Sequence, residues 1–328
     1  MQSPLLSVCL ITYNHAAYIR QAIDSVIMQK VNFSWELIIA DDFSTDGTRA
    51  ILLEYKNKYP DFIKLIFQET NVGAARNWLD LIGAPSAKYV AYFEGDDYWT
   101  DKNKLQQQVD FLETNPDYSL CYHDVVFKTS GKIRRGLHWD APEESDLQYL
   151  LRKGCYITSL SVVYKNDPGI LSFLQDFKEA PLGDYLLFIA AAERGKLKRL
   201  TKTMGVYRVH AGGTWSQLGF SKVFDNVIVT VDALYDKLGD KYHDDLCINL
   251  LGNIDAAVKE MGAGTVKNNE GLKKLLEKMN ISNYILEYIA FFAEERGKIG
   301  FYTKNVPMTL LLGGLKEKIK NKLPSIRF

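Results

Sequence analysis

The chain has 328 residues, of which 47% are hydrophobic and 24% charged, enough for one large domain and a smaller one. Lysine and arginine number 40, as do aspartate and glutamate, so the net charge is zero and nothing in it favours nucleic-acid binding. No apolar run reaches the ~20 residues that span a bilayer. Scattered cysteines without a CxxC pair, and no charged leader before an apolar stretch, predict a cytoplasmic protein.

The N-terminal third alternates short apolar runs with amphipathic stretches. The runs are typical of buried strands, and apolar residues spaced three and four apart predict helices between them. Strands that alternate with helices form parallel sheets, so this order predicts an α/β fold with a mostly parallel, Rossmann-like sheet between helices. Strands are predicted at 5–11, 35–40, 63–67 and 89–93, and helices at 19–30, 50–59 and 74–82.

The middle of the chain is predicted to extend this sheet, and the remainder to be helical. Apolar residues at helical spacing recur from about Phe220, with glycines between the helical stretches. We therefore predict a sheet domain at 1–218 and a helical C-terminal region at 219–328. In the middle we expect a helix at 102–115, a strand at 118–128, a polar loop at 130–144, a strand at 155–164, a helix at 185–193 and a strand at 198–208. In the C-terminal region we expect helices at 223–234, 243–261, 272–279 and 284–295.

The segment 309–328 combines an aliphatic face with lysines and an arginine. Such a helix can lie in an anionic membrane interface, which would place the protein at the inner face of the membrane. The alternative is a terminal helix packed on its own domain with a solvated basic side.

Polar clusters follow three of the predicted strands: Thr12-Tyr13-Asn14, Asp41-Asp42 and Glu94-Gly95-Asp96-Asp97. In an open α/β sheet, ligands bind at the carboxyl ends of the strands, where these clusters would converge. Three carboxylates around one glycine repel one another unless a cation compensates them. Mg²⁺ or Mn²⁺ prefers oxygen ligands and leaves positions for phosphate oxygens. The pattern predicts a divalent metal that holds a diphosphate.

These clusters, together with Ser44, Asp46-Gly47-Thr48 and Asn71-Val72-Gly73, resemble in order and spacing the glycosyltransferases of family 2. These are inverting enzymes of the GT-A fold that use nucleotide-diphosphate sugars. The resemblance runs from Leu5 to His210 and is specific up to Lys104, and the last third of the chain resembles no family we can name.

The resemblance implies roles for the matching residues on the donor side. One group would hold the base and ribose of the nucleotide, and three acids compete for the metal, because both Glu94-Gly95-Asp96 and Asp96-Asp97 fit the family's metal motif. The nucleotide group is Thr12, Tyr13, Asn14, Asp41, Asp42, Arg76 and Asp96, and the metal candidates are Asp97, Asp96 and Glu94.

On the chemical side, Asp184 matches the acid that the family uses as catalytic base, and Arg208 and His210 match a loop that closes over the diphosphate. The implied reaction transfers a sugar, with UDP as the expected nucleotide, to a hydroxyl of a glycan or lipid-linked glycan in surface polysaccharide or oligosaccharide synthesis. Each acid also has an ordinary alternative role as a helix cap or turn residue.

Two other functions compete with this one. A nucleotide-sugar-binding protein that has lost catalysis would keep the same pocket, and a transfer assay separates the two. A dinucleotide-dependent oxidoreductase would use a similar sheet, but the first strand-to-helix turn, Tyr13-Asn14-His15-Ala16, lacks the G-x-G-x-x-G pattern.

Overall fold

The computed structural model describes residues 3–130, 132–136, 141–177, 180–213 and 218–281. The chain divides into two compact units, Met1–Asn253 and Ile254–Phe328, and helix α9 (Phe220–Met261) contains the division. The domain boundary that we placed after residue 218 stays a prediction. The predicted helix at 284–295 and the basic segment 309–328 lie outside the described residues.

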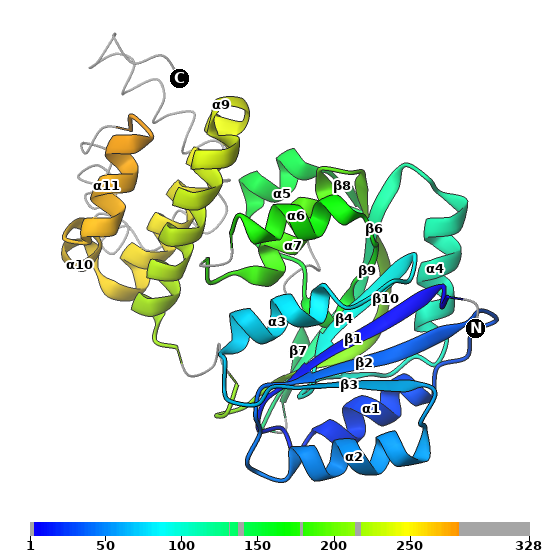
Figure 1. The fold of residues 1–328 in the computed structure, drawn as a ribbon. Coiled ribbons are helices and arrows are strands. Elements are labelled where there is room, and N and C mark those ends of the chain that lie inside the picture. Colours follow the sequence, from blue (N-terminus) through cyan, green and yellow to red (C-terminus); the bar gives the residue numbers. More distant parts are fainter. Residues whose placement is uncertain (1–2, 131, 137–140, 178–179, 214–217, 282–328) are drawn as a thin grey trace. The chain divides into compact units, whose positions relative to one another are not determined.

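The N-terminal part of the sheet is parallel, as predicted. Strand β1 pairs in parallel with β2 on one side and β4 on the other, and β2 pairs in parallel with β3 (Figure 1). The predicted strands and helices of this part are confirmed. They are β1 (Leu6–Thr12), α1 (Ile19–Ile27), β2 (Trp35–Asp41), α2 (Thr48–Lys58), β3 (Ile63–Phe67), α3 (Ala74–Ile82) and β4 (Tyr89–Glu94).

Beyond β4 the sheet becomes mixed. The order is β3-β2-β1-β4-β9-β6-β10-β5, in which β6 and β10 are parallel to each other while β9 pairs antiparallel with both β4 and β6. The predicted strands at 118–128 and 198–208 and the helices at 102–115 and 185–193 are confirmed. The elements are β5 (Tyr98–Trp99), α4 (Lys104–Thr114), β6 (Tyr118–Thr129), β9 (Val163–Lys165), α7 (Gly183–Ala192) and β10 (Lys196–Val209).

Two predictions for the middle of the chain were wrong in part. The strand expected at 155–164 is only β9, because a 3₁₀ turn at Ser159–Ser161 precedes it, closed by bonds from Ser161 to the carbonyl of Thr158. The polar stretch at 130–144 contains β7 (Lys132–Arg135), which pairs with β6, and begins β8 (Glu144–Ser145), which pairs with β10. These two short strands form because they pair with the edges of β10 and β6, and the composition of the segment itself does not predict them.

Helices α5 (Leu147–Lys153) and α6 (Pro168–Gln175) were missed, although both carry start signals. Asp146 accepts from the amide of Tyr149, and Asp167 accepts from Gly169 just after a proline at the first helical position. In the C-terminal region, α9 joins two of the predicted helices across a non-helical Tyr242. The helix expected at 272–279 is α11 (Glu270–Lys278), after the short α10 (Ala263–Lys267).

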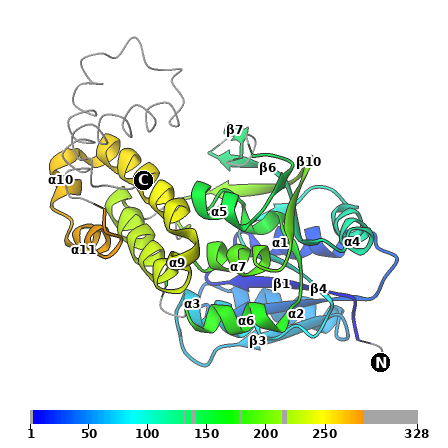
Figure 2. The same cartoon turned by 90° about the horizontal axis from the view of Figure 1, so that it is seen from above.

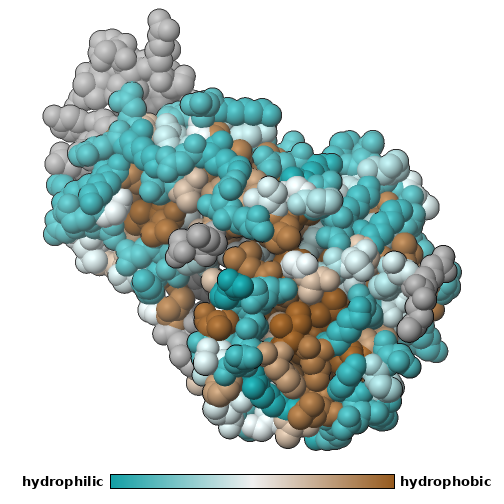
Figure 3. Space-filling view, viewed as in Figure 1, coloured by the Kyte–Doolittle hydropathy of each residue, from teal (hydrophilic) through white to brown (hydrophobic). Residues whose placement is uncertain are grey.

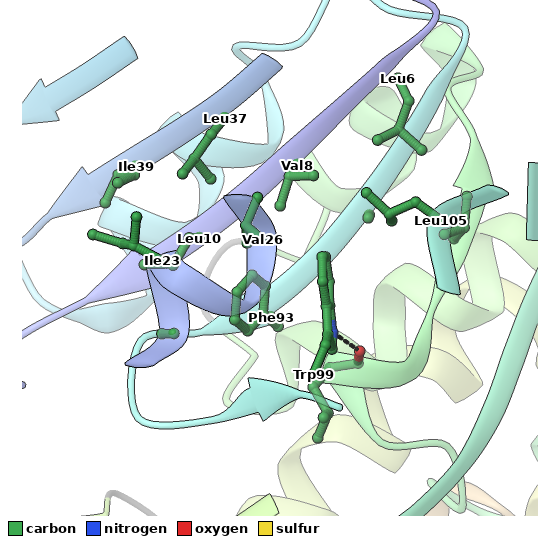
Figure 4. Close-up of a cluster of buried hydrophobic side chains, with 14 of the residues drawn as sticks. Leu6, Val8, Leu10, Ile23, Val26, Leu37, Ile39, Phe93, Trp99 and Leu105 are labelled. Carbon is green, nitrogen blue, oxygen red and sulfur yellow. Dashed lines mark hydrogen bonds between the residues drawn. The ribbon is translucent and has the colours of Figure 1, made fainter. Parts of the chain in front are cut away.

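The core lies between the sheet and its helices. Alternate residues of β1 face opposite layers, as a strand requires: Val8 and Leu10 join a cluster with α1, whereas Cys9 contacts the Leu81 carbonyl of α3 (Figure 4). Trp99 also belongs to this cluster, and the centroids of its ring and the Phe93 ring lie 4.6 Å apart. This packing fixes the strand ends from which the site is built.

On the surface seen in Figure 3, hydrophilic side chains predominate, with apolar side chains gathered over the lower centre of the view. Large apolar side chains that are exposed include Tyr13, Phe43 and Val72, each in a loop that follows a strand. Within the described residues, no helix is both long and apolar enough to cross a membrane.

Candidate active site

A pocket of about 570 Å³ opens at the carboxyl ends of the parallel strands. Its walls come from the loops after β1, β2, β3 and β4, from α3, from the start of α7 and from the end of β10. Eight residues that the sequence singled out line it: Thr12, Tyr13, Asp42, Glu94, Asp96, Asp97, Asp184 and Arg208. Asn14, Asp41, Arg76 and His210 do not line it.

The loop after β1 is held by the loop after β2. Asn14 adopts a left-handed backbone with φ 54°, its amide donates to Ser44 Oγ at 2.8 Å, and its side-chain oxygen accepts from the amide of Thr45. The side chain of Asn14 therefore ties the two loops together. Tyr13, next to it, is 45% exposed at the pocket wall, where an aromatic face is free to stack on a ring.

The two adjacent aspartates after β2 have different partners. Asp41 is fully buried and accepts from the Ser44 amide at 3.1 Å and from Arg49 Nε at 2.5 Å, so it supports its own loop. Asp42 lines the pocket, and its two carboxylate oxygens accept from the amides of Val72 and Gly73 at 2.7 and 3.0 Å.

Arg76 does not line the pocket, so its predicted contact with the base is not tested by this geometry. Its side chain is 69% exposed and pairs with Asp80 at 2.9 Å. The residues of α3 that do line the pocket include Ala75 and Trp78, so this helix contributes small and aromatic surface there.

Glu94 ends β4 and lies half-buried against the 3₁₀ turn. It accepts from Ser159 Oγ at 2.6 Å and from the hydroxyl of Tyr92 at 3.3 Å. Burial raises the pKa of Glu94 to about 8, and the charges of Asp96 and Asp184 add to the rise. Ser159 was not predicted as a site residue, because the sequence pattern predicted a strand at 155–164.

Asp97 acts as an anchor for β10. It is 1% exposed, and its Oδ1 accepts from the backbone amide of Arg208 at 2.8 Å. Its Oδ2 has no hydrogen-bond partner in the part of the chain that the structure describes, and burial raises the pKa of this carboxyl well above its usual range. One oxygen of Asp97 thus fixes the strand that carries Arg208.

Asp96 faces two histidines. Its Oδ2 lies 3.0 Å from His210 Nε2 and 3.9 Å from His15 Nε2. Since the amide of Gly212 donates to His210 Nδ1, the proton of a neutral His210 belongs on Nε2, which donates to Asp96. His15 was not predicted, and its place three residues after Thr12, whose hydroxyl its ring contacts at 3.2 Å, is the only local signal for it.

The approach of these groups depends on Gly95. A Cβ atom at this position would lie 2.9 Å from Ile19 Cδ1 and 3.0 Å from both His15 Nδ1 and Thr12 Oγ1. The glycine lets the acids of β4 pass close to the loop after β1.

Arg208 lines the pocket, but its guanidinium is engaged within the chain. It donates to the carbonyl of Asp96 and to Gln21 Oε1, and it lies over the rings of Tyr18 and Tyr98, at 5.2 and 4.3 Å. The bond to the Asp96 carbonyl holds the backbone of the segment after β4 in place.

Asp184 lies in the first turn of α7, on the pocket wall. Its Oδ1 accepts from the amide of Tyr185 at 2.8 Å, and burial raises the pKa of its carboxyl. The preceding Gly183 packs on the indole of Trp78, where an added Cβ would meet ring carbons at 3.3 Å. A half-buried carboxylate with a raised pKa, held at the start of a helix, is suited to accept a proton.

A divalent cation fits this donor set. The raised pKa values of Glu94 and Asp97 show that negative charge is unfavourable here without a cation, and Asp96 offers an oxygen ligand. His210 Nε2 beside it can serve as a nitrogen ligand in the tautomer that carries the ring proton on Nδ1, which gives up the bond from the Gly212 amide. No group of three or more His, Cys, Asp or Glu side chains arranged for a metal occurs in the described ranges. Mg²⁺ is commonly held by one or two carboxylates and completed by substrate phosphates, so two protein ligands suffice.

The comparisons with known proteins agree with this geometry. The model of the family "Glycosyl transferase family 2" matches residues 7–165. The Escherichia coli protein WfgD, named as a UDP-Glc:alpha-D-GlcNAc-diphosphoundecaprenol beta-1,3-glucosyltransferase, is 31% identical over 248 residues, which cover 73% of this chain and 87% of WfgD. The uncharacterized Mycobacterium tuberculosis protein Rv1520 is 35% identical over 216 residues, or 64% of this chain, but the match spans only 60% of its length.

Among solved structures, residues 1–349 of Staphylococcus aureus TarS in complex with UDP-GlcNAc have a TM-score of 0.65 at 15% identity, covering 91% of this chain and 93% of that one. This likeness concerns the fold. The family match and WfgD show that the chain belongs to family 2 of the glycosyltransferases, and the structural likeness shows the GT-A fold.

Proposed function

We propose that the protein is an inverting glycosyltransferase that moves a sugar from a UDP-sugar to a hydroxyl of a glycan carried on a lipid diphosphate, in surface polysaccharide or lipid-linked oligosaccharide synthesis. The observation that carries the proposal is the meeting of Asp184 and Asp96 in one pocket, the first suited to accept a proton and the second beside His210. The donor and acceptor in the name of WfgD support this choice of donor and acceptor class.

The nucleotide is assigned to the side of the pocket formed by the loops after β1 to β3. Tyr13 offers a ring for stacking, Thr12 lies at the wall, and Asp42 holds the loop of Val72 and Gly73 against the same space. Asn14 and Asp41 support these loops from behind, and a contact from Arg76 stays a prediction.

The diphosphate is assigned to the acidic side, with Mn²⁺ or Mg²⁺ held by Asp96 and His210. When bound, the cation supplies positive charge against the diphosphate. Glu94 is bonded to Ser159, and Asp97 is bonded through Oδ1 to the amide of Arg208, so we assign both to support of the loop that carries Asp96. Asp97 Oδ2 has no hydrogen-bond partner among the described residues, and Asp97 therefore stays a candidate metal ligand.

The chemistry is assigned to Asp184. The acceptor oxygen attacks the anomeric carbon while the bond from that carbon to the diphosphate breaks, and Asp184 takes the hydroxyl proton. A single displacement with one base and no covalent carboxylate intermediate inverts the configuration at the anomeric carbon.

Binding of the nucleotide tests the proposal first. We expect calorimetric titration to show UDP binding that is strengthened at least ~10-fold by Mn²⁺, with this gain lost in Asp96→Ala, since removing a charged ligand costs several-fold to a hundredfold in affinity. GDP, dTDP and NAD serve as comparisons. Failure of a folded protein to bind any nucleoside diphosphate would refute the proposal.

The main alternative is a nucleotide-sugar-binding protein without catalysis. Both proteins would pass the titration, so transfer of labelled sugar to a lipid-diphosphate acceptor decides between them. Binding without any transfer on acceptors of this class would favour the alternative.

The contact between Gly183 and Trp78 gives a more local test. We expect Gly183→Ala to lower turnover by about 10- to 100-fold, because a shift of about 1 Å in a catalytic group has effects of this size. UDP affinity should stay unchanged, since the contact lies on the Asp184 side of the pocket. Gly252→Ala, at a helical site with open space around the new methyl group, is the matched control. Normal turnover of Gly183→Ala would show that Asp184 does not depend on this packing.

A further inference from the structure

The β6–β7 hairpin concentrates positive charge in a chain whose net charge is zero. From Lys128 to Arg135 it carries four basic residues and no acid. All four residues of β7 are exposed, and Ile133 among them is 68% exposed. Basic side chains around an exposed aliphatic one are the composition of surfaces that rest on anionic bilayers.

The hairpin lies at the same edge of the sheet as the active site. Strand β10 ends next to His210, which contacts Asp96, and Val209 of β10 is paired with Thr129 of β6. Neighbouring strands lie about 4.8 Å apart, so the turn of the hairpin starts one strand away from the diphosphate side of the pocket.

The strand β7 also lies on the pocket side of β6. Strand β10 occupies one edge of β6, and the other edge pairs first with β9, toward β4, and then with β7 (Figures 1 and 2). The hairpin therefore extends the edge that faces the end of β4 and its acids.

A row of side chains connects the hairpin to the pocket. Tyr207, which lines the pocket, is paired with Phe127, and their rings lie 4.9 Å apart. Phe127 is paired in turn with Arg134, whose guanidinium lies 5.1 Å from its ring. Directly paired residues share a face of the sheet, so Arg134, and Lys132 two residues before it, lie on the face of the pocket.

The geometry points to an anionic lipid bilayer as the partner of this hairpin, and this inference rests on the proposed function. A sugar linked to a membrane lipid through a diphosphate stays close to the head groups, so the pocket that receives it must open next to the bilayer. We propose that the cations Lys132 and Arg134, which share one face of β7, rest on that surface and set the protein with its pocket toward it.

The test measures binding of the full chain to vesicles, without donor or acceptor. We expect binding to vesicles that contain phosphatidylglycerol, little binding to phosphatidylcholine alone, and a decrease at high salt. The double variant Lys132→Glu, Arg134→Glu should bind the anionic vesicles at least ~10-fold more weakly. Ile133→Ser, on the opposite face of β7, should have a smaller effect. Lys30→Glu, Lys58→Glu makes the same charge change at exposed residues on the opposite edge of the sheet and should have a much smaller effect.

Two results would overturn the inference. One is that the wild type does not bind anionic vesicles, or that the hairpin variant binds them as well as the control variant does. The other is that only reversal of Lys316, Lys318, Lys320 and Lys322 in the C-terminal segment removes binding. Thermal unfolding of the hairpin variant, compared with wild type, confirms its fold. Because neither this control nor vesicle binding needs a nucleotide, failure of the transferase proposal would be seen separately.

Discussion

Asp184→Asn should lower the turnover for sugar transfer by about 10²-fold or more, the range in which general bases contribute. Asparagine keeps the size of the side chain and an acceptor for the Tyr185 amide, so UDP-sugar affinity should change little. Single-turnover rates and titration of UDP on the same preparation measure the two effects.

The pH profile adds a second measurement to this variant. Burial raises the pKa of Asp184, and a base acts only when deprotonated, so wild-type activity should fall as pH drops through a value above that of an ordinary aspartate. The residual activity of Asp184→Asn should not show this fall at low pH. Asp146→Asn, at the exposed start of α5, is the matched control and should behave as wild type. Near-normal turnover of Asp184→Asn would remove Asp184 from the mechanism.

Asp96→Asn should remove most of the metal-dependent part of nucleotide affinity, at least ~10-fold, and leave the metal-independent part intact. His210→Ala should act in the same direction. Because both side chains would hold one cation, the double variant should lose much less than the sum of the two single losses. Additive losses would mean that the two residues act separately.

Asp97→Asn is the neighbouring control, with a different expected outcome. Asparagine can still accept from the Arg208 amide. Burial raises the pKa of Asp97 above its unfolded value near 3.8, so the native state binds this proton more tightly, and stability falls as pH rises through the interval between the two values. Without metal, Asp97→Asn should therefore be at least as thermostable as wild type at neutral pH. A large loss of thermal stability would show that the charge of Asp97 is needed for folding.

The strands and helices of the N-terminal part could be predicted from the local pattern of apolar residues. Strands β1, β2 and β4 are buried on both faces, so their sequences are mostly apolar, and the helices of this part carry a regular apolar spacing. The pattern failed at Ser159 and at β7. There the conformation depends on a bond to Glu94 and on the open edge of β6, which come from distant parts of the chain.

The sequence by itself determined the family, the alternation of strands and helices in the first half and the set of candidate acids, because these depend on residue types that follow one another. Only the tertiary structure decided which of these acids line the pocket and which support the surrounding loops. Asp41 and Asp42 are neighbours, yet one is buried against Arg49 and the other lines the pocket. Asp96 and Asp97 divide in the same way between His210 and the Arg208 amide. Successive residues at a strand end point in different directions, so what each carboxylate meets depends on the elements packed beside it.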